Sequence, residues 1–225
     1  MAWTRVSNSS AESTGWAQSL SFNFTTSTGT NSILIVSTGT YDTSIDTVTA
    51  VTFNGVSMTN AVSTPNSTNA CSTVWYLTNP PIGTYAVVCT FGGGDTWVLG
   101  AVAAATQFDG IDQNTPLRAS TAATNSSSAV QNPYVDVPNC SVNDLVYGAC
   151  LRNGSDLTPA DSSDWTQYNT NDNEIGSGTY ANGTAGTVQL NWTSGAVSDW
   201  AACGCAFITA STSVASRRTL LGVGV

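Results

Sequence analysis

Hydrophobic and polar residues alternate along most of this chain, with the period of two that a β-strand requires. In the segment 19–25, Leu20, Phe22 and Phe24 fall on one side, and hydroxyl or amide residues fall on the other. Gly, Pro, Asn and Asp interrupt the alternation roughly every 10–15 residues, and Asn54-Gly55 is a strong signal for a tight hairpin. No segment has a convincing helical period. We therefore predict an all-β fold, an antiparallel β-sandwich of jelly-roll or Ig-like type, with about twelve to fifteen strands.

Two pairs of segments echo one another in the two halves of the chain. FGGGDTWVLGAVAAATQF resembles WTSGAVSDWAACGCAFIT, because each has a glycine-bearing lead-in, an Asp, a Trp and a strand of small apolar residues. NSILIVSTG likewise resembles NDLVYGACLRNG. We interpret the chain as one domain, since the second half has no clear counterpart of the Pro-Pro segment in the first. The predicted boundaries are a single domain at 1–225, pseudo-repeat halves at about 18–119 and 134–210, and a C-terminal strand or tail at 211–225.

Two cysteines bracket a Pro-Pro sequence in CSTVWYLTNPPIGTYAVVC, which runs from Cys71 to Cys89. If the two apolar segments pair as a hairpin, Cys71 lies opposite Cys89 and Trp75 lies opposite Tyr85, all on one face. Opposed β carbons are about 4.5–5.5 Å apart, so this register predicts a cross-strand disulfide. The alternative is a pair of buried free thiols.

The other four cysteines allow two more disulfides. Cys203 and Cys205 point to one side of a strand, which we expect to lie beside the strand that ends at Cys150. Among Cys140, Cys150, Cys203 and Cys205 the sequence leaves three pairings open. An even count of six cysteines favours an oxidising compartment. We expect no zinc site, because Cys-x-Cys without histidine is a poor ligand set.

Three motifs carry a resemblance to a known type of domain. They are the hairpin GVSM after Asn54, the sequence WYLTNPPIGT and the sequence FDGIDQNTP. Over about residues 18–210 the pattern is similar to a β-sandwich module of bacterial extracellular proteins and phage structural proteins. The resemblance implies a surface or virion location and lends no catalytic residues. The six cysteines are a departure from that pattern.

The charge of the chain limits its partners. Charged residues are only 8% of the sequence, lysine and histidine are missing, and the net charge is −9. A negative surface does not suit nucleic acid or an anionic membrane, and no apolar run could span a bilayer, so we expect neither partner. Low charge reduces repulsion between copies, and lysine is a common protection of sheet edges. Composition alone fits self-assembly and a merely soluble surface equally well.

We predict no catalytic residue, cofactor or metal. Without histidine or lysine, Ser–His–acid and Ser–Lys arrangements are excluded. A pair of carboxylates for glycoside hydrolysis remains open, but nearly all the acids lie in turn-like sequence. Calcium could bind at Asp109 and Asp112 or at 169–176, although turn chemistry is the favoured interpretation of both segments.

Glycans could meet the protein in two ways. Indole rings in polar sequence could stack against sugars, and asparagines in Asn-x-Ser/Thr sequons could carry glycans after passage through a glycosylating pathway. The tryptophans in polar sequence are Trp3, Trp16, Trp165 and Trp192, whereas Trp75, Trp97 and Trp200 are expected in the core. The best glycosylation candidates are Asn66, Asn125, Asn153 and Asn182.

The sequence ASRRTLLGVGV ends the printed chain on an apolar run. This run could complete its own sheet or add to an edge of another copy, and AWTRV at the other end could do the same. A head-to-tail contact of this kind builds a fibre. We therefore predict a structural subunit of an extracellular filament or surface assembly that binds copies of itself; the alternatives are a carbohydrate-binding surface module and a phage virion decoration or fibre protein. The predicted assembly residues are Leu220, Leu221, Val223, Val225 and Trp3.

Overall fold

The computed structural model confirms the all-β, antiparallel fold. It describes residues 2–13, 15–41, 47–64, 69–92, 98, 100–125, 132–154, 156–169, 174–195 and 198–211. The described residues form seventeen strands, a few more than the sequence predicted, and none of them is helical. Accordingly, no described helix could cross a bilayer.

The first half of the chain builds two sheets. One has the strand order β1-β9-β3-β7-β6, and the other has the order β2-β8-β4-β5. The strands are β1 (Thr4–Glu12), β2 (Ser19–Thr26), β3 (Ile33–Tyr41), β4 (Thr47–Phe53), β5 (Val56–Ser57), β6 (Thr59–Ser63), β7 (Ala70–Thr78), β8 (Gly83–Gly92) and β9 (Gly100–Asp109).

The second half builds two more. Their orders are β10-β17-β12-β15-β14 and β11-β16-β13. The strands are β10 (Leu117–Asn125), β11 (Tyr134–Cys140), β12 (Leu145–Asn153), β13 (Thr158–Pro159), β14 (Ser162–Asn169), β15 (Glu174–Asn182), β16 (Gly186–Thr193) and β17 (Trp200–Phe207).

The two halves share one topology. In order across the sheet, β1, β9, β3, β7 and β6 hold the same places in the first five-stranded sheet as β10, β17, β12, β15 and β14 hold in the second. The echoing sequences fall on matching strands, namely β9 with β17 and β3 with β12. The strands of the first half begin with β1 at Thr4, and those of the second half begin with β10 at Leu117. Both halves therefore begin before residues 18 and 134, where the sequence pattern placed their starts. Descent of the halves from a duplication stays a prediction.

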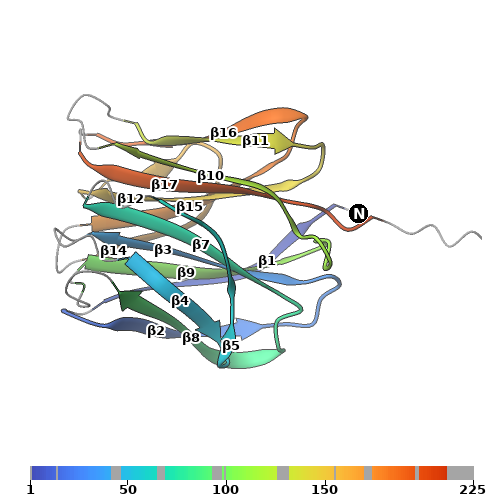
Figure 1. The fold of residues 1–225 in the computed structure, drawn as a ribbon, viewed down its shortest axis with the longest axis horizontal. Coiled ribbons are helices and arrows are strands. Elements are labelled where there is room, and N and C mark those ends of the chain that lie inside the picture. Colours follow the sequence, from blue (N-terminus) through green and yellow to red (C-terminus); the bar gives the residue numbers. More distant parts are fainter. Residues whose placement is uncertain are drawn as a thin grey trace, which may run out of the picture.

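The four sheets are stacked face to face (Figure 1). The two five-stranded sheets lie in the middle and enclose a central core that includes Ile35, Phe108, Leu145 and Phe207. In each half, one outer core lies between the five-stranded sheet and the smaller sheet. Strands of the middle sheets, such as β12 and β17, are buried almost throughout, whereas outer strands such as β2 alternate. This difference follows from burial on both faces in one case and on one face in the other.

The predicted disulfide between Cys71 and Cys89 is wrong. β7 pairs with β3 and β6, and β8 pairs with β2 and β4, so the two cysteines lie in different sheets. The Pro80–Pro81 segment carries the chain from one layer to the next and does not form a hairpin. Thr40 lies opposite Cys71, and Leu20 and Val51 lie opposite Cys89.

The remaining disulfide predictions are also wrong, although one premise is confirmed. β12 and β17 are neighbours, as expected. However, Cys150 lies opposite Ala202 and faces an outer core, whereas Cys203 and Cys205 face the central core. All six cysteines are buried, and none of them is in a disulfide: Cys71, Cys89, Cys140, Cys150, Cys203 and Cys205. The cysteine count therefore no longer bears on the compartment of the protein.

Candidate functional site

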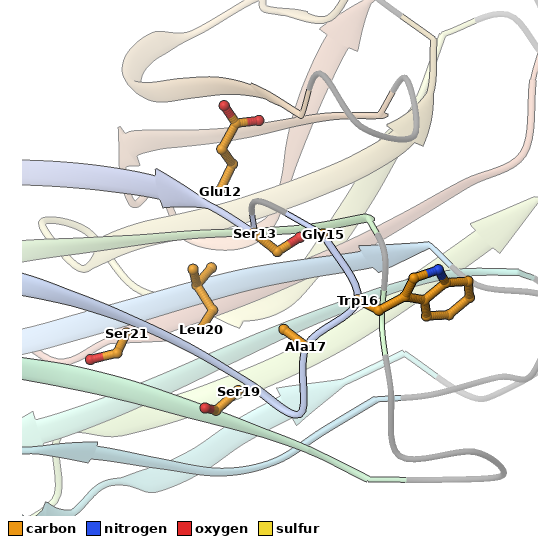
Figure 2. A pocket seen from close by; sticks show the side chains of 8 residues that line it. All are labelled: Glu12, Ser13, Gly15, Trp16, Ala17, Ser19, Leu20 and Ser21. Atoms are coloured by element: carbon orange, nitrogen blue, oxygen red, sulfur yellow. The ribbon is translucent and has the colours of Figure 1, made fainter.

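A hollow of about 350 Å³ lies where the chain passes from β1 to β2 (Figure 2). Figure 2 shows the Trp16 ring and the Glu12 carboxylate extending in different directions from this connection, with the Ser19 and Ser21 hydroxyls on the side away from the Trp16 ring. The described residues that line it are Glu12, Ser13, Gly15, Trp16, Ala17, Ser19, Leu20 and Ser21.

Backbone hydrogen bonds fix this connection on both sides of Trp16. The N–H of Ser13 donates to the carbonyl of Ala101 at 2.9 Å, and the N–H of Ala101 donates to Ser13 Oγ at 3.1 Å. On the other side, Ala17 and Val98 exchange two bonds of 3.0 and 2.9 Å. The position of the Trp16 backbone is therefore set by the neighbouring strands.

A buried amide from the other half of the chain supports the base of the hollow. Asn169, at the end of β14, is fully buried. Its Nδ2 donates to Ser13 Oγ at 3.2 Å and to the carbonyl of Ala101 at 3.1 Å. The bonds tie the connection between β1 and β2 to the second five-stranded sheet.

The described lining of the hollow combines an indole ring, hydroxyl groups and one carboxylate. Trp16 is 60% exposed and offers a flat apolar face, and the exposed hydroxyls of Ser19 and Ser21 flank the buried Leu20. Glu12 is the one charged residue in the described lining. A paired-carboxylate mechanism needs a second acid at this place, and the described lining does not supply one.

A smaller hollow of about 190 Å³ lies at the connection between β7 and β8. It is lined by Ser27, Gly29, Ser32, Asn79, Pro80 and Ile82, and Ile82 is 60% exposed. Behind it, Ser32 Oγ donates to Asp109 Oδ1 at 2.6 Å. This arrangement engages the Asp109 side chain in the packing of the loop.

Of the two segments considered for calcium, the one that contains Asp112 shows turn chemistry. Asp112 Oδ1 accepts the N–H groups of Asn114 at 3.0 Å and Thr115 at 2.8 Å, and these bonds lower the pKa of Asp112. Residues 170–173 of the second segment lie outside the described residues. In the part of the chain that the structure describes, no three His, Cys, Asp or Glu residues form a metal-binding group.

The four tryptophans that lie in polar sequence differ in their exposure to solvent. Trp165 and Trp192 are core residues, with 4% and 0% exposure. Trp3 packs edge-on against Phe108 and Tyr180, with ring centroids 5.9 and 5.5 Å apart, so its contacts lie inside its own chain. Trp16 alone among the described tryptophans is largely exposed.

The glycosylation candidates differ in access. Asn182 is exposed at the end of β15, and Asn153 is half-buried at the end of β12. The amide nitrogen of Asn125 is buried, which does not suit an acceptor in the folded protein. Asn66 lies outside the described residues, as do the predicted assembly residues Leu220, Leu221, Val223 and Val225.

The open edges of the sheets form a second kind of candidate site. β2 has one hydrogen-bonded neighbour in the described structure, β8, and pairs with it in unbroken register over all eight residues from Ser19 to Thr26. Its sequence, SLSFNFTT, contains no charged residue and no proline. Asn23 and Thr25 are exposed, and Phe22 is half-buried. β2 is thus an uncharged edge strand without a bulge.

A polar seam between the halves was missed by sequence reasoning. Arg5 on β1 donates from Nε to Asp164 Oδ1 at 2.6 Å, and Thr106 Oγ1 donates to Asp164 Oδ2 at 2.6 Å. The Asp164 side chain, on β14, is fully buried, and this burial raises its pKa even though Arg5 and Thr106 act in the opposite direction. A charge pair 159 residues apart in sequence leaves no local signal in the chain.

Comparison of the chain with protein families, with characterised proteins and with solved structures gave no match.

Proposed function

We propose that the protein is a structural subunit of an extracellular or particle-surface assembly, joined to other copies through sheet edges. The observation that carries the proposal is the regular, uncharged edge of β2. An edge strand presents unpaired N–H and C=O groups, which another strand can pair with unless the edge is protected. Within the described part of the chain, the β2 edge has no charged residue, no proline and no register shift to protect it.

The other strands that end the described sheets are less suited to pairing. β5 and β13 have only two residues each. The longer edges have a register shift, and most also carry a charge. They are β1 with Arg5, Glu12 and a shift after Arg5, β6 with a shift after Asn60, β10 with Arg118 and a shift after Leu117, β11 with Asp136 and a shift after Val137, and β14 with Asp164 and a shift after Ser163.

The occupant of the β2 edge would be a strand of a second copy. The apolar segment that includes Leu220, Leu221, Val223 and Val225 has the composition of such a donor strand, and β2 of the second copy is the other choice. Trp3 is not part of this proposal, since its ring packs within its own chain. The charge-poor surface and the resemblance to extracellular and virion β-sandwich modules support an exterior location.

The test is to place a lysine on the β2 edge. Wild-type protein should form filaments or regular clusters in negative-stain electron microscopy, and Asn23→Lys should abolish them, because a charge on an edge strand opposes pairing. Thr90→Lys is the matched control, since Thr90 is exposed on β8, which has neighbours on both sides. Uniform monomers of the wild-type protein, or assemblies that survive in Asn23→Lys, would contradict the proposal. Loss of assembly in both variants would show a general charge effect and would also contradict it.

A further inference from the structure

A hydroxyl, a carboxylate and a side-chain amide meet where the chain enters β3. Ser32, which directly precedes β3, is 8% exposed, and Gln107 on β9 is fully buried. The Ser32 hydroxyl donates to Asp109 Oδ1 at 2.6 Å, and the amide nitrogen of Gln107, Nε2, lies 3.5 Å from Ser32 Oγ. Because Nε2 is bonded directly to the amide carbon Cδ, this contact places the hydroxyl oxygen beside that carbon. A nucleophile, a base and an acyl group are therefore within reach of one another.

The backbone of Ser27 fixes the orientation of the Gln107 amide. Oε1 of Gln107 accepts the N–H of Ser27 at 2.9 Å, and Nε2 donates to the carbonyl of Ser27 at 3.0 Å. These two bonds define which end of the amide is oxygen. The N–H of Ser27 also lies where negative charge would develop on Oε1 if the amide carbon were attacked, so it can act as an oxyanion donor.

Asp109 contacts both the hydroxyl and the amide nitrogen. Its Oδ1 accepts from Ser32 Oγ at 2.6 Å and from Gln107 Nε2 at 3.4 Å. The same carboxylate oxygen can therefore take the proton of the hydroxyl and deliver it to a departing nitrogen, as a general base and then a general acid. Gly29 leaves room for this carboxylate, because a Cβ at position 29 would overlap both of its oxygens.

We propose that Ser32 and Gln107 form an intramolecular ester in the folded protein. Ser32 Oγ bonds to Gln107 Cδ as the bond between Cδ and Nε2 breaks, the hydroxyl proton passes through Asp109 to the nitrogen, and one ammonia molecule leaves. A hydroxyl and an amide thus become an ester and ammonia, and the reaction needs no oxidant, reductant or second substrate. The hollow of about 190 Å³ whose lining includes Ser27, Gly29 and Ser32 gives ammonia a route to solvent.

The fold supplies what this reaction lacks in free solution. An amide is a poor acyl donor, but a nucleophile that is held beside it has a very high effective concentration. Ammonia escapes into dilute solution, which draws the reaction forward, and the burial of Gln107 protects the ester from water. The ester would join β9 to the start of β3 between residues 75 apart in sequence, in a chain whose cysteines form no disulfide. This covalent brace goes beyond the proposed assembly and does not depend on it.

The test is the mass of the intact, denatured chain. Wild-type protein that has been incubated in its folded state at neutral pH should be lighter than its sequence by one ammonia molecule. A peptic digest at acid pH should contain one linked peptide pair, which joins the segment around Ser32 to the segment around Gln107. Brief mild alkali should separate the pair with uptake of one water, and should leave a glutamate side chain at position 107. The digest is needed because a succinimide at Asn54-Gly55 would also lose ammonia.

Three variants each remove one reacting group. Ser32→Ala removes the nucleophile, Gln107→Glu removes the amide, and Asp109→Asn removes the base, so each should abolish the linked peptide pair. Gln113→Glu is the matched control, because the amide of Gln113 is also bonded to backbone groups, at 3.1 and 2.8 Å. Gln113→Glu should keep the linked pair in full.

The wild-type measurement decides the matter even if a variant does not fold. A wild-type chain that keeps its full sequence mass after prolonged incubation would overturn the assignment. So would a loss of ammonia that maps to an Asn-Gly sequence, or a linked pair that persists in any of the three variants. The mass does not depend on filament formation, so failure here and failure of the assembly proposal can be told apart.

Discussion

Asp164 is the residue that joins β14 to β1 at the seam between the halves. Its buried carboxylate accepts hydrogen bonds from Arg5 and Thr106, and Arg5 also donates from Nη2 to the Asp164 carbonyl at 3.0 Å. Arg5 supplies the one cation that contacts this carboxylate among the described residues. Removing the cation leaves a charge in a place that water reaches poorly, which is a costly change in a protein interior.

Arg5→Met should therefore lower the free energy of unfolding at neutral pH by about 2 kcal/mol. This is less than the loss expected for a fully buried ion pair, because the Arg5 side chain is 28% exposed and water screens its charge. Burial already raises the pKa of Asp164 in the folded protein, and loss of Arg5 should raise it further. A carboxyl with a raised folded pKa binds its proton more tightly in the folded state, so stability from this group increases as pH falls. The loss in Arg5→Met should accordingly shrink between pH 7 and pH 4 in urea titrations.

The double variant Arg5→Met/Asp164→Asn is the control for this pH dependence. It removes the titrating group, so its stability relative to wild type should lack the improvement at low pH that Arg5→Met shows. If Arg5→Met is equally destabilised at pH 7 and pH 4, the seam is not held by the ionised carboxylate of Asp164.

At the scale of elements, the sequence was informative about strands and poor about their partners. The alternation around Phe24 and the Asn54-Gly55 turn predicted β2 and the hairpin between β4 and β5, and both residues of that turn have positive φ, 52° and 72°. The segments around Pro80 failed because a period of two defines the faces of a strand and says nothing about its sheet. The alternation around Pro80 fits a hairpin and a crossing between layers equally well. The choice depends on the pairing of β7 with β3, which is a long-range contact that the local sequence does not encode.

The tryptophans show the same limit, because the local sequence does not tell whether a side chain is buried. Trp16, Trp165 and Trp192 all lie among polar residues in sequence, yet only Trp16 is exposed. In β16, Thr193 points outward while the Trp192 indole turns inward, and in β14 Thr166 is exposed while Trp165 is buried, whereas Trp16 belongs to a connection between strands. A tryptophan next to glycine outside any alternating run was the one available signal.

The contact between the middle sheets depends on close approach of β3 and β12. A Cβ at Gly39 would lie 2.6 Å from Leu151 Cδ1 and 2.8 Å from Leu151 Cβ, which is closer than real Cβ contacts allow. Gly39→Ala should therefore lower the free energy of unfolding by about 1–3 kcal/mol through overpacking. Leu151→Ala should cost about 2–5 kcal/mol through a cavity.

The double variant tests whether these two residues meet as described. Because Leu151→Ala removes the γ and δ carbons that lie near position 39, Gly39→Ala/Leu151→Ala should lose less stability in urea titrations than the sum of the single losses. Strict additivity would mean that the new methyl group finds space elsewhere, and it would contradict the close packing of β3 on β12.

Over the whole molecule, the two halves are joined by the central core. Both halves contribute buried residues to it, and it is at least as large as either outer core. Separating the halves would expose this apolar surface to water, and the free energy of that exposure scales with its area. Neither half can then unfold without removing one wall of the core of the other, so we expect a single cooperative transition.

Two buried thiols provide reporters for this prediction, one in each outer core. Cys89 packs between the sheets of the first half, where burial raises its pKa to about 12, and Cys140 packs between the sheets of the second half. In native protein at pH 8 neither thiol should react with a maleimide, because both are buried and the reactive thiolate is disfavoured. Pulse labelling along a urea gradient, read by peptide mass spectrometry, should show both thiols becoming reactive at the same midpoint, and all six cysteines should label in full denaturant without a reductant. Midpoints that differ beyond error would show two sandwiches that unfold separately, and the shared central core would then contribute little to holding the halves together.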